Sequence, residues 1–541
     1  MLVSLLITSV VILLCVLFNR VSNKVGMPVL LAFIVLGMLF GTDGLLKIDF
    51  ENYGLAEQIC SVALIFIMFA GGFGTNWKEA KPVAVKAVLL STAGVVLTAF
   101  FTGLFCYFAL HMELLNSFLI GAVISSTDAA SVFSILRSKK MGLKYHTASL
   151  LEMESGSNDP CSYMLTAVVL AAMSGSASGE AVLSMIFFQL FYGIAAGVVI
   201  AVAAVFVLRR TSFFTDGFDM AFVIGVAILS YALPSLFGGN GYLSAYITGI
   251  ILGNAKIVNK KSLVHFFDGV TGLMQMLIFF LLGLLATPSR IPSVFPTALA
   301  VAVFLTFVAR PLAVFGILTP FKCKIKQQLL VSFAGLRGAA SIVFAIMAVV
   351  NINSLEAVQD VYHIIFCIVL LSIAFQGTLL SPAAKLLHMS DKDEDIMKTF
   401  SDYSEETDLQ FITIEVTSGH PWLEKKIKEI VLTPDTLIVL ILRDGETIIP
   451  DGNTEFKEND RVVLSARKFR DNHISLSLTE QKIEAGSEWA GKRILDFSPR
   501  SGELVIIIMR GEQTVIPRGD TLIEEGDVLV LNSVCRKRQT A

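Results

Sequence analysis

Charged residues are scarce in this sequence of 541 residues, and they are unevenly distributed. Only 16% of the residues are Asp, Glu, Lys or Arg, whereas 54% belong to the hydrophobic set and the mean hydropathy is +0.72. Ordinary soluble domains carry about 25% charged residues, so most of this chain lacks the surface of a soluble protein. Of the 87 charged residues, 38 lie in residues 1–390 and 49 in the last 151. The composition therefore predicts a membrane domain followed by a soluble one.

The sequence also lacks the signatures of several other protein classes. The net charge of −3 gives no basic excess that would hold nucleic acid, so we exclude nucleic acid as a partner. The seven cysteines are scattered without a CxxC spacing, which indicates neither a disulfide framework nor a zinc site. No nucleophile elbow, phosphate-binding loop or metal-ligand cluster is present in the sequence. We therefore expect neither an enzyme nor a bound cofactor.

Long apolar runs dominate the first 390 residues. Runs of about 20 apolar residues predict thirteen membrane spans, centred near residues 10, 34, 66, 95, 125, 160, 195, 226, 246, 275, 305, 338 and 370. One set of alternate loops carries 18 Lys and Arg residues, and the other set carries only Lys47 and Arg290. Basic loops stay in the cytoplasm, so we predict the N-terminus outside and the C-terminal region inside. Arg310 and Asp268 lie near span ends, and we expect their polar ends to reach the membrane surface.

After His388 the pattern changes to short β-rich runs with turn residues. Residues 419–464 align with residues 486–531 at an offset of 67, and 16 of the 46 positions are identical. We predict a membrane domain at 1–388, a linker at 389–407 and a cytoplasmic α+β tail of two modules, 408–470 and 471–541. Arg443 and Arg510 lie at equivalent strand ends, where each is either solvated or able to reach a phosphate.

The sixth predicted span contains the densest polar group, ESGSNDP at residues 154–160. Each ionisable residue inside a span costs about 2.5 to 3.5 kcal/mol on insertion scales, so each needs a pairing or functional reason. Asp159, Ser155 and backbone carbonyls freed by Pro160 offer oxygen ligands to a partly dehydrated monovalent cation. A carboxylate also binds H⁺, so the two ions would compete for one site. We interpret Glu154 as a structural residue paired with a buried cation, and leave the role of Glu152 open.

Two further spans are interrupted by polar residues or glycine. The fifth contains Thr127 and Asp128, and the twelfth contains Arg337 between two glycines. The matching strings DAAS at 128–131 and GAAS at 338–341 stand at corresponding places in two six-span halves, which predicts inverted repeats with two broken, crossing helices. We expect Asp128 to cap a half-helix N-terminus. Arg337 would neutralise either Glu154 or the carbonyl ends of a half-helix.

Together these motifs resemble the monovalent cation:proton antiporter-1 family, in particular its bacterial NhaP/CvrA-like branch with C-terminal TrkA-C (RCK-C) modules. The resemblance covers essentially the whole chain. The motifs that carry it are Glu-x-Glu-Ser-Gly-Ser-Asn-Asp-Pro at 152–160, Thr127-Asp128, Gly335-Leu336-Arg337-Gly338 and GYLSAYITGIILGN at 241–254.

The resemblance implies a homodimer in which a six-helix core slides against a dimerisation domain. It also implies roles for individual residues. Asp159 would carry the cation and the proton, with Asn158, Ser155 and Thr127 beside it; Asp128 would offset a helix dipole; Glu154 and Arg337 would form a structural ion pair. One departure is Ala70, at a position where family members often carry an acid.

We therefore expect a multi-pass antiporter of the bacterial cytoplasmic membrane, embedded in lipid, that exchanges K⁺, Na⁺ or both for H⁺ by an elevator-type alternating-access mechanism. Exchange should be electroneutral, because Asn158 cannot carry a second proton. Resemblance to potassium transporters with such modules makes a nucleotide, cyclic di-AMP, the leading candidate for a tail ligand. Two alternatives remain: an RCK-gated cation channel, disfavoured because no TVGYG-like filter is present, and a membrane-bound sensor.

Overall fold

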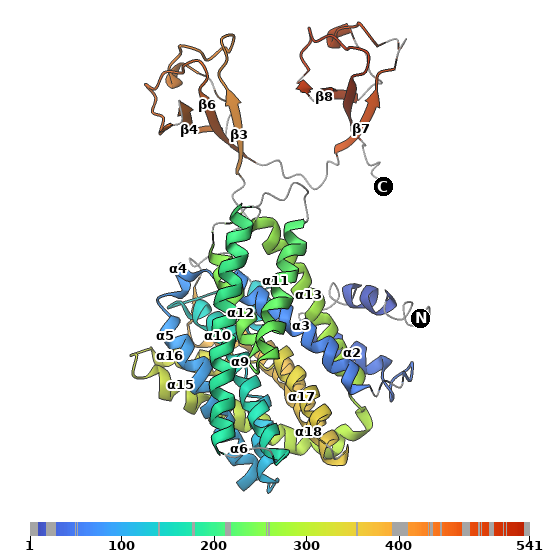
Figure 1. The fold of residues 1–541 in the computed structure, drawn as a ribbon, viewed down its shortest axis with the longest axis vertical. Helices are drawn as coiled ribbons and strands as arrows, with labels where there is room; N and C mark the ends of the chain where they lie inside the picture. The colour runs from blue at the N-terminus through green and yellow to red at the C-terminus, as the bar shows by residue number, and fades with distance from the viewer. Residues whose placement is uncertain are drawn as a thin grey trace. The chain divides into compact units, whose positions relative to one another are not determined.

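The computed structural model describes residues 9–17, 29–48, 50, 52–138, 141–175, 179–210, 218–255, 257, 260–352, 355–391, 409–430, 432, 436–443, 446–467, 476–484, 487, 489–496, 503–511, 513–515 and 517–534. The chain forms two compact units, residues 1–405 and 406–541 (Figure 1). Most of the predicted linker, from residue 392 onward, lies outside the described residues.

The first unit is built almost entirely of helices (Figure 1). Residues 9–17 are helical. The further helices are α2 (Val29–Phe40), α3 (Tyr53–Gly74), α4 (Trp77–Ala80), α5 (Ala84–Leu89), η1 (Leu90–Gly94), α6 (Val95–Phe108), α7 (Leu114–Val123), α8 (Ala129–Ser138), α9 (Thr147–Met173), α10 (Gly179–Arg210), α11 (Phe218–Leu236), α12 (Gly241–Asn254), α13 (Lys260–Leu285), η2 (Pro288–Arg290), α14 (Ile291–Phe304), η3 (Leu305–Ala309), α15 (Arg310–Leu318), α16 (Ile325–Phe333), α17 (Ala339–Asn351), α18 (Leu355–Leu371), η4 (Ser372–Gly377) and α19 (Thr378–Leu386). A two-stranded sheet joins β1 (Gly142–Leu143) to β2 (Ser390–Asp391).

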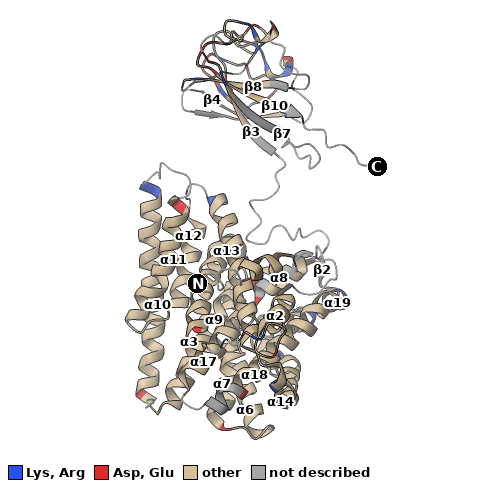
Figure 2. Cartoon of the chain, turned by 90° about the vertical axis from the view of Figure 1, so that its right-hand side faces the viewer, with Lys and Arg blue, Asp and Glu red and all other residues tan. Residues whose placement is uncertain are grey.

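Many of these helices have the length and composition of membrane spans. Within the described residues, seven helices are long and apolar enough to cross a membrane, and three apolar helices are shorter. In the helical unit the acidic and basic residues lie mainly near helix ends (Figure 2). The predicted helical membrane fold is confirmed, and the count of thirteen spans stays a prediction.

The helices associate in two groups. In the first group α3 packs against α12 and α13, and α12 packs against α10 and α11. In the second, α9 packs against α5, η1 and α7, and α14 and α17 pack against α18. Glycines allow close approach within the first group, because a Cβ at Gly72 would overlap the backbone of α12 and one at Gly249 or Gly253 would overlap that of α3. Such contacts between small residues are a main source of helix association in lipid.

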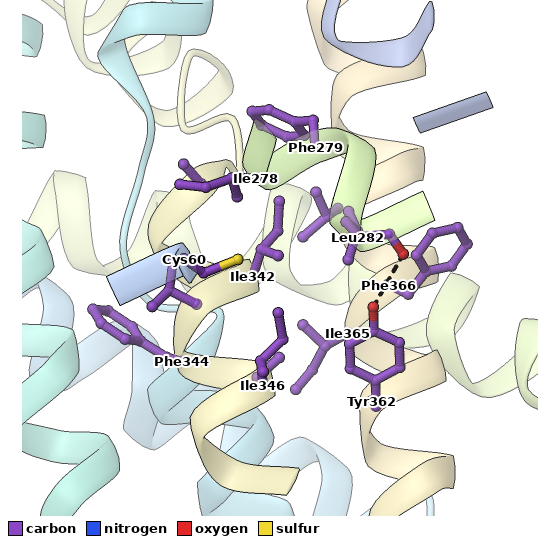
Figure 3. Packing of buried hydrophobic residues seen from close by; sticks show 14 of the residues in the cluster. Cys60, Ile278, Phe279, Leu282, Ile342, Phe344, Ile346, Tyr362, Ile365 and Phe366 are labelled. Carbon is purple, nitrogen blue, oxygen red and sulfur yellow. Dashed lines mark hydrogen bonds between the residues drawn. The ribbon is translucent and has the colours of Figure 1, made fainter. Parts of the chain in front are cut away.

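A continuous apolar core connects the two groups. Figure 3 shows Cys60 of α3 and Phe279 of α13, from the first group, packed with Ile342 of α17 in the second. A hydrogen bond of 3.0 Å from the Tyr362 hydroxyl of α18 to the Leu282 carbonyl of α13 links the groups at the same place (Figure 3). Apart from such bonds, dispersion and shape hold this contact together, and neither is as directional as a hydrogen bond.

The second unit contains two four-stranded antiparallel sheets of the same design. Their strand orders are β3-β6-β4-β5 and β7-β10-β8-β9. The first sheet consists of β3 (Leu409–Glu415), β4 (Leu437–Arg443), β5 (Glu446–Ile448) and β6 (Arg461–Arg467), and the second of β7 (Leu476–Lys482), β8 (Glu503–Arg510), β9 (Gln513–Val515) and β10 (Val528–Val534). β3 and β7 begin 67 residues apart, as do β6 and β10, which is the offset of the sequence repeat.

The tail differs from the predicted α+β class in one respect. In the part of the tail that the structure describes, the helical segments are short 3-10 turns, Ile427–Glu429 and Ile494–Asp496, and no α-helix occurs. Each turn packs against one face of its sheet: Ile427 belongs to the core of the first module and Ile494 to that of the second. A three-residue turn is enough to cover so small a sheet, so the alternating apolar strands dominate the fold.

Candidate functional site

Two helix interruptions meet inside the helical unit. α7 ends at Val123 and α8 begins at Ala129, while α16 ends at Phe333 and α17 begins at Ala339. The backbone N–H of Asp128 donates to the carbonyl of Leu336 at 2.8 Å. The non-helical segments 124–128 and 334–338 therefore lie side by side, and their helix ends carry unsatisfied backbone groups that need compensating charge.

Asp128 compensates the N-terminal ends. Its carboxylate accepts from the backbone N–H of Ser131 at 3.3 Å and from the Ser131 hydroxyl at 2.5 Å, in the first turn of α8. The same carboxylate lies against Gly338, directly before α17, where an added Cβ would overlap it. One negative charge thus serves the positive ends of two helices, as a carboxylate at a helix N-terminus does.

Arg337 compensates the carbonyl end of α7. Its guanidinium donates to the carbonyls of Ser125 and Ser126 at 2.9 and 2.6 Å, and the side chain is buried. Of the two partners that the sequence left open for Arg337, the structure shows the half-helix carbonyls. The expected ion pair between Glu154 and Arg337 is therefore wrong.

Glu154 pairs with Arg310 instead. The Arg310 guanidinium donates to the Glu154 carboxylate, and the two side chains are 1% and 0% exposed. The expectation that Arg310 extends to the membrane surface is also wrong, because α14, η3 and α15 form one continuous helical run in which position 310 lies inside. Sequence spacing gave no signal for this pair, since its members are 156 residues apart.

Thr127 joins the interruption to α9. Its carbonyl accepts from the Ser155 hydroxyl at 2.5 Å, and its hydroxyl accepts from the Asn158 amide at 2.7 Å. Asp159 is the residue after Asn158 within α9, and its side chain is buried. Pro160 lies within the same helix, and its carbonyl accepts at 2.9 Å from the side-chain amide of Asn240, the N-cap residue of α12. The structure thus brings together all four residues predicted for the cation and proton site.

Thr127, Ser155 and Asp159 line a cavity of about 480 Å³, whereas Asn158 is not among its described lining residues. Its walls come from α3, the 126–128 segment, α9, α13 and the start of α17. The acids along it are Asp128, Glu152, Asp159 and Asp268, and no Lys, Arg or His is among the described residues that line it. Acidic side chains gathered along one recess favour the entry of cations over anions. Ala70 also lines the cavity, where an acid would have added a ligand.

The sequence analysis did not predict that residues of α13 line the cavity. Asp268, Thr271, Gly272 and Gln275 all line it. They are spaced as i, i+3, i+4 and i+7 and so share one helix face, a periodicity that could have been read from the sequence. Asp268 was expected at the membrane surface; the structure places this exposed acid on the cavity wall.

Aromatic rings follow one turn beyond Asp159. Tyr163 of α9 meets Tyr242 of α12 with ring centroids 5.1 Å apart, and Tyr242 meets Tyr231 of α11 at 4.9 Å. Phe344 of α17 lies 5.8 Å from Tyr163. None of these four rings lines the cavity, which follows α9 only from Glu152 to Asp159. The rings come from both helix groups, and Tyr163 lies on α9 beyond the part that lines the cavity.

The two tail arginines have structural partners. Arg443 donates to both carboxylate oxygens of Asp460 at 2.7 Å, and Arg510 does so to Asp527 at 2.9 Å. Both aspartates are buried. Burial alone raises the pKa of Asp460 and of Asp527, but the arginine and backbone hydrogen bonds outweigh it and hold each pKa below its usual value. Neither guanidinium is simply solvated, because each donates two hydrogen bonds to a buried carboxylate.

Comparisons with known proteins agree with this architecture. The profile of the family described as sodium/hydrogen exchanger, transmembrane, matches residues 9–386, and the TrkA-C domain matches residues 411–468 and 478–531. The K(+)/H(+) antiporter NhaP of Alkalimonas amylolytica is 34% identical over 511 residues, which cover 93% of this chain and 88% of the relative. The K(+)/H(+) antiporter NhaP2 of Shewanella sp. (strain MR-4) is 30% identical over 82% of this chain and 78% of its own.

A solved structure has the same fold. The sodium proton antiporter MjNhaP1 of Methanocaldococcus jannaschii superposes with a TM-score of 0.63 at 23% sequence identity, and the match covers 70% of this chain and 99% of that one. At this identity the likeness concerns the fold alone.

Proposed function

The chain belongs to the sodium/hydrogen exchanger family, with TrkA-C modules in its tail, and from this premise we propose that it exchanges K⁺, Na⁺ or both for H⁺ at a shared site on Asp159. Membership makes the protein a membrane-embedded cation/proton antiporter and not an enzyme. The named relatives are antiporters, so neither the channel nor the sensor alternative is proposed.

The observation that carries the proposal is the acid-lined cavity that ends at Asp159. A cation entering it meets a lining with four acidic residues and, among the described lining residues, no Lys, Arg or His. At Asp159 it would find the hydroxyls and carbonyls around Thr127 and Ser155 as further oxygen ligands. A proton on Asp159 removes the charge that holds the cation. Binding of one ion therefore excludes the other, which is the requirement for coupled exchange.

Alternating access is proposed to follow from the two helix groups. In the described conformation the cavity reaches both Asp268 and Asp159, and the proposal is that the rings around Tyr242 close the opposite side. If the second group, with α9 and the two interrupted segments, slides against the first, Asp159 passes from one side to the other in an elevator-type motion. The glycine contacts of α3 with α12 favour the first group as the fixed scaffold and dimer partner.

The remaining expectations concern orientation, stoichiometry and the tail. The basic loops favour an N-terminus outside and the tail in the cytoplasm, which makes the described cavity inward-facing. Asn158 cannot titrate, so one cation should exchange for one H⁺. We retain domain boundaries at 388, 407 and 470, and a regulatory role for the tail. The engaged arginines give no support to nucleotide binding through Arg443 or Arg510.

A flux assay tests the proposal. Purified protein in liposomes should respond to a pH jump with saturable K⁺ or Na⁺ counterflow, and comparing K⁺, Na⁺ and Li⁺ gives the preference. With the potential clamped by valinomycin, initial rates should coincide at different voltages. Steep voltage dependence would mean that a second acid such as Glu152 also carries charge, and fast uncoupled flux would contradict antiport.

Truncation tests the tail. A chain lacking residues 400–541 should still exchange cations for protons, with a changed pH set point, because all four residues of the proposed site, Thr127, Ser155, Asn158 and Asp159, belong to the helical unit. Loss of all transport in a well-folded truncated protein would instead make the tail part of the transport machinery.

A further inference from the structure

A second cavity lies in the same helical unit, away from the acid-lined one. Its volume is about 270 Å³, and its walls come from α14, η3, α18, η4 and α19, together with Phe333 and Arg337. Two π-helical turns contribute to the lining. Leu305, Thr306 and Phe307 belong to η3, and Ser372, Phe375 and Gln376 belong to η4. π-Helical turns inside longer helices are rare and occur frequently at functional sites.

The cavity opens toward lipid. Phe307 and Phe375 at its lip are 67% and 61% exposed, whereas Leu305 and Ile368 deeper in the walls are 2% and 1% exposed. The lip belongs to two helical runs that are long and apolar enough to span a membrane, Pro288–Leu318 and Asp360–Leu386. In a membrane antiporter such exposed rings face hydrocarbon, so the medium at the mouth is lipid.

Water is a poor occupant of this cavity. The Ser372 hydroxyl accepts from the Arg337 backbone N–H at 3.0 Å and donates to the Gln376 side chain at 2.5 Å. The Gln376 amide donates in turn to the Phe333 carbonyl at 3.3 Å. The Ser372 and Gln376 side chains thus have polar partners, and among the described residues that line the cavity Nε of Arg337 is the single buried side-chain donor without one. A buried water needs two to four polar partners, and apolar cavities stay dry or take apolar guests.

We propose that an acyl chain of a membrane phospholipid occupies the cavity lined by η3 and η4. The chain would enter between Phe307 and Phe375 and lie against Leu305 and Ile368. It would support Ser372 and thereby the backbone of Arg337, whose guanidinium holds the carbonyls of the 124–128 segment. The cation site and the lipid site are thus connected through Arg337.

Photolabelling tests the proposal. The full-length protein is reconstituted in phosphatidylcholine vesicles in which a small fraction of the lipid carries a diazirine midway along one acyl chain. After irradiation, peptide mass spectrometry should find label on the buried residues Leu305 and Ile368 as well as on the exposed ring of Phe307. Label on Phe307 without label on Leu305 and Ile368 would overturn the proposal, because any lipid-facing ring reacts from outside the cavity.

A filled cavity provides the control. Ala302 lines the cavity, so Ala302→Phe should reduce labelling of Leu305 and Ile368 several-fold. Val202 lies on α10 and its side chain is 58% exposed, so Val202→Phe should leave the labelling of Leu305 and Ile368 unchanged. Label on Phe206 of α10 serves as the internal standard, and Ala302→Leu replaces the larger substitution if that variant does not fold. Unchanged labelling in a folded Ala302 variant would contradict the proposal. Labelling needs no transport, so its failure is distinct from a failure of antiport.

Discussion

The helical unit and the tail both bury carboxylates, and they treat them differently. In the tail, Asp460 and Asp527 each receive a two-fold hydrogen bond from an arginine. In the helical unit Glu154 is likewise paired with Arg310, but Asp159 lies in a cavity whose described lining contains no base. The difference separates carboxylates that stabilise the fold from Asp159, which we propose binds a cation and a proton in turn. A permanent cationic partner on Asp159 would prevent the proposed competition between cation and proton.

The sharpest test of this comparison is the replacement of Asp159. Asp159→Asn keeps the shape of the side chain and removes its charge, so exchange should fall to background while the protein stays folded. Liposome flux after a pH jump measures the activity, and size-exclusion chromatography checks folding. Asp268→Asn is the matched control on the cavity wall and should retain coupled exchange. Wild-type flux from Asp159→Asn would remove Asp159 from the mechanism.

The second test concerns the paired acid in the helical unit. Glu154→Gln leaves Arg310 buried without a counter-charge and should lower the free energy of unfolding by about 3 to 5 kcal/mol. Thermal unfolding in detergent compares Glu154→Gln, Arg310→Gln and the double variant. Strong coupling between these two substitutions is expected. The control is a second cycle that combines Glu154→Gln with Arg337→Gln. A coupling energy in this cycle as large as that between Glu154 and Arg310 would contradict the observed pairing.

The third test applies the same logic to the tail. Asp460→Asn removes the charge that Arg443 binds and should cost the module about 1 to 3 kcal/mol. Hydrogen exchange of β6 in the intact protein measures the loss, and Asp451→Asn, on the exposed surface, is the control. Little change in β6 protection would mean that the pair contributes no stability.

The pH dependence of the tail follows from the lowered pKa values of Asp460 and Asp527. A carboxyl whose folded pKa is below its unfolded value of about 3.9 stabilises the fold above that value, and this contribution disappears as the pH falls through the folded pKa. Protection of β6 and β10 should therefore be constant near neutral pH and decline only below about pH 4. Asp460→Asn should flatten this decline in β6 alone; a decline near neutral pH would contradict it.

The smallest expected effect concerns the rings beyond Asp159. Tyr163→Ala opens the contact with Tyr242 and should produce a proton leak of a few-fold without abolishing exchange, because no charge is removed. Collapse of an imposed pH gradient in the absence of exchangeable cation measures the leak. Tyr192→Ala, on α10, is the control. A Tyr163→Ala protein whose proton leak equals that of the wild type would mean that other residues close this side.

Much of the candidate site could be predicted from the sequence because its parts are local. Ser155, Asn158 and Asp159 lie within five residues of one helix, so any helical arrangement brings them near one another. Asp128 is next to Thr127 at the start of a helix, and a cap of this kind depends only on neighbouring residues. The strand repeat of the tail was equally visible, because the alternation of apolar residues repeats at a fixed offset.

The sequence by itself therefore determined the division into an apolar and a polar region, the acidic motif on α9 and the duplicated tail. Only the tertiary structure decided which arginine meets Glu154, that Arg337 serves carbonyl ends, and that α13 completes the cavity wall. The charge of a segment and its hydrophobic periodicity depend only on residues that are close in the sequence. A buried ion pair between two helices depends on which helices pack together. In lipid that choice is made by glycine contacts and side-chain shape, because hydrophobicity alone does not distinguish one apolar helix face from another.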